Sequence, residues 1–143
     1  MTEPVNFGMV KGKKRAAQLP GTGGMIMTIA EIARLLDAKV CCCADRLETQ
    51  VHSGCGCDMM SDVLAFVKDR AVLLTGLANP QVVRTAEMMD IVCIVMVRGK
   101  APTAAMIELA EDRGIPILAT KMRMFSACGT LYNAGLLQEG GEH

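Results

Sequence analysis

The sequence predicts an α/β fold, a three-layer α/β/α sandwich around a largely parallel sheet of about five strands. Two observations lead to this prediction. From residue 71 onward, short apolar runs alternate with amphipathic segments in the order β-α-β-α-β-α, the pattern of parallel strands joined by right-handed crossovers. The run "IVCIVMV" (91–97) is apolar at every position, as expected for a strand that helices cover on both faces.

The first half of the chain contributes shorter elements. Thr28 and Glu31 form a capping box at the start of a helix with apolar residues at helical spacing. Asp58 is predicted to cap a second, shorter helix. Two short runs between these helices are predicted to be strands. The expected elements are a helix from residue 28, strands at 39–43 and 49–53, and a helix at 59–67.

The second half of the chain has clearer boundaries. Asn79 is predicted to cap a helix that carries Pro80 at its first position. Thr103 is predicted to start the next helix and Gly114 to stop it, and Gly135 is predicted to end the last one. The expected strands are 71–76, 91–97 and 115–120, and the expected helices are 79–90, 103–114 and 124–135.

The chain is predicted to form one domain. Its 143 residues are enough for a single hydrophobic core. Residues 1–24 are polar, basic in the middle and end in "LPGTGG", which favours a flexible N-terminal extension. We therefore expect one folded domain over residues 25–138 and a short tail at 139–143.

The composition argues against several functions. Fifteen lysines and arginines balance fifteen acidic residues, and aromatic residues make up only 3% of the chain, so we expect neither nucleic-acid nor membrane binding. The sequence has no apolar run long enough for a transmembrane helix and no signal-peptide pattern, which favours a cytoplasmic location. Neither a nucleophile-elbow motif nor a Walker lysine occurs, so no catalytic residues are predicted and the protein is not expected to be an enzyme.

Small and cationic residues follow the predicted parallel strands. Because ligands bind beyond the carboxyl ends of strands in open α/β sheets, these residues are candidates for binding a phosphate or a carboxylate. The alternative is that they are ordinary turn and capping residues. The candidates are Thr75, Gly76, Asn79, Arg98, Gly99 and Thr120, with Lys100, Lys121 and Arg123 beside them.

Five of the seven cysteines lie between residues 40 and 57. If the two short strands pair, Cys41, Cys43, Cys55 and Cys57 could bind zinc or an iron–sulfur cluster, although C-x-C pairs are unlike the common frameworks. Two alternatives stay open, a reactive thiol at Cys55 or Cys57 near a helix N-terminus and simple packing. Packing is the expected role of the remaining cysteines, Cys42, Cys93 and Cys128.

The stretch "RLETQVHSGCGCDMMSDVLAFV" and the segments after it resemble the DRTGG domain family, which is related to the N-terminal domain of HPr kinase/phosphorylase. The resemblance covers about residues 27–137. The positions that match the family pattern are Leu47, Val51, Gly54, Asp58, Ser61, Asp62, Val63 and Ala65. The signature itself is altered, with Glu48, Thr49, His52, Ser53 and Cys55 at positions where the family carries other residues.

The resemblance implies an α/β/α domain without catalytic activity of its own. Members of the family look like regulatory, nucleotide-sensing, dimer-forming modules, which makes Ser53 and Gly54 of the signature loop candidate ligand-binding residues. The expected partners are a second copy of the chain and a small anionic ligand such as an adenine nucleotide. Cysteine-bearing relatives further suggest a link to anaerobic redox or hydrogenase metabolism and a redox-enzyme partner, with the iron–sulfur or metal-binding accessory role as the alternative.

Overall fold

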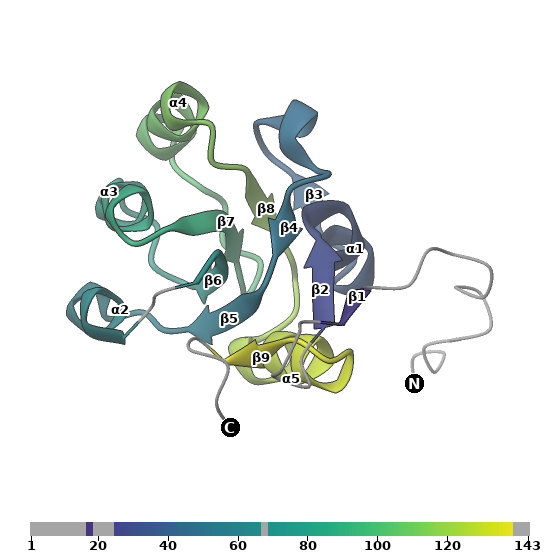
Figure 1. Ribbon diagram of the computed structural model, residues 1–143. Coiled ribbons are helices and arrows are strands. Elements are labelled where there is room, and N and C mark those ends of the chain that lie inside the picture. Colours follow the sequence, from purple (N-terminus) through teal and green to yellow (C-terminus); the bar gives the residue numbers. More distant parts are fainter. Residues whose placement is uncertain (1–16, 19–24, 67–68, 139–143) are drawn as a thin grey trace.

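The computed structural model describes residues 17–18, 25–66 and 69–138. A six-stranded sheet forms its centre, in the order β3-β8-β7-β6-β5-β9 (Figure 1). All neighbouring strands are parallel except β3, which runs antiparallel to β8. The strands are β3 (Lys39–Val40), β5 (Ser53–Gly56), β6 (Ala71–Thr75), β7 (Ile91–Met96), β8 (Ile117–Ala119) and β9 (Leu137–Gln138). The predicted α/β class with a largely parallel sheet is confirmed.

Helices cover both faces of the sheet (Figure 1). Side chains from α2, α3 and α4 form one apolar cluster with Leu73 and Ile94 of the central strands. Side chains from α1 and α5 form the other cluster, with Val72 and Val95. Because successive side chains of a strand point to opposite faces, the two clusters bury both faces of β6 and β7. The helices are α1 (Ile29–Leu35), α2 (Met60–Phe66), α3 (Gln81–Met88), α4 (Ala104–Arg113) and α5 (Met124–Asn133).

The predicted boundaries of α4 correspond to local backbone and side-chain features. Thr103 Oγ1 accepts a hydrogen bond of 3.1 Å from Met106 N at the start of α4. Gly114 ends the same helix in the left-handed conformation, with φ 71°. The longest described helices have ten residues. In the part of the chain that the structure describes, no helix combines the length and apolar character needed to span a membrane.

A smaller antiparallel sheet, in the order β1-β2-β4, leads into α1. Its strands are β1 (Ala17–Gln18), β2 (Met25–Thr28) and β4 (Gln50–Val51). The predicted capping box follows β2, where Thr28 N donates to Glu31 Oε1 at 2.8 Å and Glu31 N donates to Thr28 Oγ1 at 3.2 Å. Apart from β1, the predicted extension 1–24 lies outside the described residues, as does the tail 139–143.

The two short strands of the first half were predicted with the wrong boundaries. The strand expected at 39–43 ends at Val40, because Cys43 adopts a left-handed conformation (φ 56°) and begins the 3-10 helix η2 (Ala44–Arg46). The strand expected at 49–53 divides into β4, which pairs with β2, and β5, which joins the main sheet. Gly54 and Gly56 therefore both lie within a strand. An added Cβ at Gly56 would lie 2.5 Å from Cys128 Sγ, so the glycine allows α5 to pack closely on β5.

Candidate functional site

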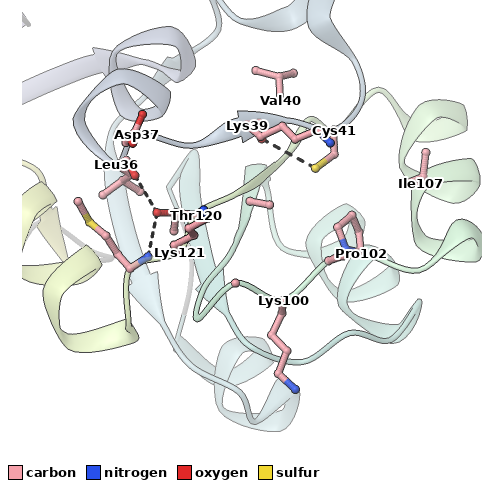
Figure 2. Close-up of a pocket in the computed structure, with 14 residues that line it drawn as sticks. Leu36, Asp37, Lys39, Val40, Cys41, Lys100, Pro102, Ile107, Thr120 and Lys121 are labelled. Atoms are coloured by element: carbon pink, nitrogen blue, oxygen red, sulfur yellow. Dashed lines mark hydrogen bonds between the residues drawn. The ribbon is translucent and has the colours of Figure 1, made fainter.

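A cavity of about 590 Å³ opens at the carboxyl ends of β7 and β8, beside the edge strand β3 (Figure 2). Two of the predicted ligand-binding residues, Gly99 and Thr120, line it. The volume lies within the range of about 300–1,000 Å³ that is typical of small-molecule sites. The position beyond the strand ends is where open α/β sheets bind ligands.

Backbone hydrogen bonds hold the two loops that border this cavity. Arg98 N donates to Met122 O at 2.7 Å, and Gly99 N donates to Thr120 O at 3.0 Å. Arg98 and Gly99 both adopt left-handed conformations, with φ of 63° and 71°, so the chain turns sharply after β7. The loop after β7 is thereby joined to the loop after β8, and this fixes the backbone from which Lys100 and Lys121 project.

Thr120 connects α1 to the end of β8. Its side chain is buried, and its hydroxyl donates to Leu36 O at 2.7 Å while accepting from Met122 N at 3.1 Å (Figure 2). Both hydrogen bonds are made to groups of the protein itself. Thr120 therefore positions the cavity wall, and its hydroxyl hydrogen is already donated to the Leu36 carbonyl.

The charges around the cavity favour an anionic ligand. Lys39, Lys100 and Lys121 line it together with a single carboxylate, Asp37, and all four side chains are exposed. Three positive charges and one negative charge leave a local excess of two positive charges. Lys100 extends away from the other lining side chains in Figure 2, and an exposed lysine has the rotamer freedom to turn toward a bound anion.

Part of the cavity lining is apolar. Its apolar residues include Leu36 just after α1, Val40 of β3, Pro102 before α4 and Ile107 of α4. Ligand sites are commonly lined by apolar side chains together with a small number of placed polar groups. The cavity thus offers an apolar surface for a ring and cations for a phosphate or carboxylate.

At the end of β6 the predicted anion-binding groups bind a carboxylate of the protein itself. Asp58 Oδ1 accepts hydrogen bonds from Thr75 Oγ1 at 2.9 Å and from Gly76 N at 2.7 Å. Arg98 Nη2 lies 3.9 Å from Asp58 Oδ2. The pKa of Asp58 is lowered from its ordinary value, chiefly by the hydrogen bond from Gly76 N. The hydrogen bond from Thr75 and the charge of Arg98 lower it further. The carboxylate was predicted to cap α2, but α2 begins at Met60, and the hydrogen bonds of Asp58 instead join the segment before α2 to the end of β6.

We expect Asp58→Asn to make stability less dependent on pH in the acid range. The unfolded chain takes up the Asp58 proton near pH 3.8, and the folded protein takes it up only at lower pH. In wild type, the Asp58 carboxylate therefore stabilises the fold fully at pH values above its pKa in the unfolded chain. This stabilisation is lost as pH falls through the pKa of Asp58 in the folded protein. Urea unfolding at a series of pH values should show the difference between wild type and Asp58→Asn narrowing as pH falls.

Asp62→Asn is the control for this prediction, since Asp62 is exposed on α2 and takes no part in the Asp58 cluster. At neutral pH, loss of charge-assisted hydrogen bonds should make Asp58→Asn less stable than wild type by roughly 1–2 kcal/mol. A constant difference between wild type and Asp58→Asn across the acid range would contradict the assigned role of Asp58.

The other predicted ligand-binding residues are not at the cavity. Asn79 Oδ1 accepts from Gln81 N at 2.8 Å at the start of α3. Ser53 lies at the opposite, amino-terminal end of the sheet, where its hydroxyl donates to Asp69 O at 2.7 Å. Gly54 lies within β5 against Leu136. The structure thus separates the signature-loop candidates from the candidates at the strand ends.

Two residues important to this region were not among the sequence candidates. Lys39 reaches the cavity because β3 is the edge strand beside β8, and no local pattern indicates which strand is its neighbour. Asp58 was predicted only to cap a helix, whereas its carboxylate accepts hydrogen bonds from Thr75 and Gly76. Its position just before α2 and level with the end of a parallel strand could have indicated the contact with Thr75, had the pairing of β5 with β6 been known.

The four-cysteine metal site is not assembled. Cys41 and Cys43 follow β3, whereas Cys55 and Cys57 belong to β5 and the residue just after it. Three strands lie between β3 and β5, which places the two pairs roughly 19 Å apart at about 4.8 Å per strand. No single zinc ion or cluster can contact both pairs in this arrangement. Among the cysteines predicted to pack in the core, Cys42 and Cys93 are buried.

A mostly parallel sheet between two helical layers, with a cationic cavity at its carboxyl edge, defines an α/β domain of the kind that binds ligands beyond its strand ends. A similar fold occurs in the crystal structure of the CBS and DRTGG domains of the regulatory region of Clostridium perfringens pyrophosphatase complexed with the activator diadenosine tetraphosphate. The TM-score is 0.60 at 15% sequence identity, and the similarity covers 77% of this chain and 48% of that chain. The chain thus spans about half the length of that structure.

The DRTGG domain family matches residues 31–134. The chain therefore belongs to the DRTGG domain family, and the resemblance noted in the sequence is confirmed. No curated protein sequence matches the chain.

Proposed function

We propose that this DRTGG domain is a non-catalytic regulatory module that binds a small anionic ligand, an adenine nucleotide, in the cavity beside β3. The observation that carries the proposal is the group of three lysines around one cavity at the carboxyl edge of the sheet. The ammonium groups would contact phosphates, and apolar lining residues such as Pro102 and Ile107 would contact the base.

The pyrophosphatase structure supports the ligand class, because its regulatory region is complexed with an adenine-containing activator, diadenosine tetraphosphate. The present chain has the same fold over most of its length. The sequence adds that no catalytic motif is present. The ligand class, the shared fold and the lack of a catalytic motif all agree with a regulatory role, in which ligand binding would change the activity of a partner protein.

The proposal is tested by calorimetric titration with AMP, ATP and diadenosine tetraphosphate. We expect the double variant Lys100→Gln/Lys121→Gln to bind the preferred nucleotide at least about tenfold more weakly than wild type, since each lost charged contact to a phosphate contributes about 1 kcal/mol or more at an exposed site. Wild-type affinity should also fall as salt concentration rises.

Arg84→Gln is the matched control, because Arg84 is an exposed cation on α3 and does not line this cavity. It should bind as wild type does. Absence of binding by wild type at millimolar nucleotide would reject the proposal. Equal weakening by Arg84→Gln would show that general charge, rather than this cavity, attracts the nucleotide.

We also propose that the protein acts as a homodimer, with a cytoplasmic location and a redox-enzyme partner as the accompanying predictions. The support for a protein interface is exposed apolar surface on α5, where Phe125 is 91% exposed and Tyr132 51% exposed. Large aromatic side chains are enriched at protein interfaces. Sedimentation equilibrium over a range of concentrations measures the oligomeric state, and a monomer at all concentrations would reject the dimer.

A further inference from the structure

Two thiols and one carboxylate converge behind the edge strand, on the side of the sheet that carries α4. The Sγ atoms of Cys42 and Cys43 and a carboxylate oxygen of Glu111 all lie within 4.8 Å of one another. The cysteines are 6% and 5% exposed, whereas Glu111 is exposed. An ion could therefore reach the thiols from the solvent side, next to Glu111.

The local backbone brings these three residues together. The chain leaves β3 at Val40, and the left-handed conformation of Cys43 turns it into η2. Glu111 lies in the last turn of α4, and its Oε2 atom accepts a hydrogen bond of 3.1 Å from Cys43 N. This hydrogen bond holds the carboxylate beside the cysteine pair.

The surroundings of the thiols favour a cation. Cys43 Sγ donates to Ala110 O at 3.5 Å, in the last turn of α4, and Cys42 Sγ donates to Ile115 O at 3.7 Å, just after that helix. The C-terminal end of α4 carries the negative pole of the helix dipole. A divalent ion stabilises thiolates directly.

We propose that Cys42, Cys43 and Glu111 bind a zinc ion, with a water molecule as the fourth ligand. Thiolate and carboxylate are both common zinc ligands, and a tetrahedral ion with Zn–S bonds of about 2.3 Å needs sulfur atoms about 3.8 Å apart. The atoms are at most 4.8 Å apart, so binding requires the sulfur atoms to approach each other by no more than about 1 Å. Each thiol releases its proton to solvent on binding, and Glu111 enters as the carboxylate.

Binding would leave the carbonyl of Ala110 hydrogen-bonded within the protein. Ala110 O loses the contact with the Cys43 thiol but still accepts from Ile115 N at 3.0 Å. The ion would join the segment after β3 to α4, and the three residues just before the cysteine pair belong to β3 and the cavity wall, including Lys39 and Cys41. Zinc would therefore stiffen one wall of the cavity, whatever ligand that cavity binds.

Titration of the reduced full-length chain with Cd²⁺ alone, followed by competition with Zn²⁺, tests the proposal. Cd²⁺ is a thiophilic substitute, and we expect one equivalent to produce the ultraviolet thiolate-to-cadmium band, which Zn²⁺ then removes. Cys43→Ser should abolish the band. Glu111→Gln should weaken metal binding at least about tenfold, since even loss of an outer contact to a metal ligand typically costs 10–100-fold. At the same concentration, Zn²⁺ should raise the Tm of wild type more than that of Glu111→Gln.

Two matched variants serve as controls. Glu108→Gln changes an exposed glutamate on the same helix, and Cys57→Ser changes a cysteine just after β5, at the far side of the sheet from β3. Both variants should bind metal as wild type does. Because Glu111 is exposed, its replacement should leave the fold intact even if Cys43→Ser does not. Failure of wild type to give the band at equimolar Cd²⁺, wild-type affinity in Glu111→Gln, or an equal loss in Cys57→Ser would each overturn the proposal.

Discussion

Ile94→Ala is expected to lower the free energy of unfolding by about 4 kcal/mol, toward the upper part of the range for removal of large aliphatic side chains from protein cores. Ile94 is fully buried in β7. Its backbone is held on both sides, since it pairs with Leu73 of β6 and Ile117 of β8. The strands therefore cannot move inward to fill the space that the substitution leaves, and the full cost of a cavity should be observed.

Val92→Ala provides the comparison within the same strand. Val92 is only partly buried and packs at the margin of the cluster under α1 and α5, so the expected loss is about 1 kcal/mol. Urea unfolding of wild type and both variants measures these differences. The dependence of the free energy of unfolding on urea concentration should be compared among the three proteins. Similar losses for Ile94→Ala and Val92→Ala would show that the centre of β7 is not packed as the structure describes.

The second large effect is expected at Gly135, where alanine should lower the free energy of unfolding by about 2–3 kcal/mol. Gly135 has φ 110°, a conformation that residues with a Cβ rarely adopt. An added Cβ would also overlap Met25 Cγ and lie 3.0 Å from Met25 Cβ. Because Met25 N donates to Gly135 O at 2.9 Å, β2 cannot move away without losing that hydrogen bond.

Gly129→Ala is the matched control, in the helix that ends just before Gly135. Gly129 lies within α5, and an added Cβ there would meet nothing within 4 Å. Alanine is favoured over glycine inside a helix by roughly 0.5–1 kcal/mol, so this variant should be more stable than wild type. The pair should thus change stability in opposite directions. A loss of stability in Gly129→Ala, or no loss in Gly135→Ala, would contradict the conformations assigned to these glycines.

Local signals predicted much of the second half of the chain. The continuous apolar run around Ile94 indicated a strand covered on both faces, and Thr103 and Gly114 marked the two ends of α4. Each of these features depends on residues only a few positions apart in the chain. They are the periodic spacing of apolar side chains, capping hydrogen bonds and backbone conformation. Helices and strands of this kind can be predicted before any partner is known.

The cysteine-rich segment shows where such prediction ends. The alternation expected of a strand would have placed Cys41 and Cys43 together and Cys42 opposite. In the structure the left-handed turn at Cys43 places Cys42 and Cys43 in the same apolar cluster instead. The distance between this pair and Cys55 depends on the order of strands in the sheet, which connects residues far apart in sequence.

By itself, the sequence determined the α/β class, the family, most helix ends and the residues that follow the parallel strands. The tertiary structure decided which of those residues meet. It placed Gly99 and Thr120 at a cavity with Lys39. Thr75 and Gly76 instead hydrogen-bond to Asp58, and Ser53 lies at the opposite end of the sheet. The physical reason is that strand order and edge pairing arise from packing and hydrogen bonds between distant segments, whereas caps and apolar periods are set by neighbours in the chain.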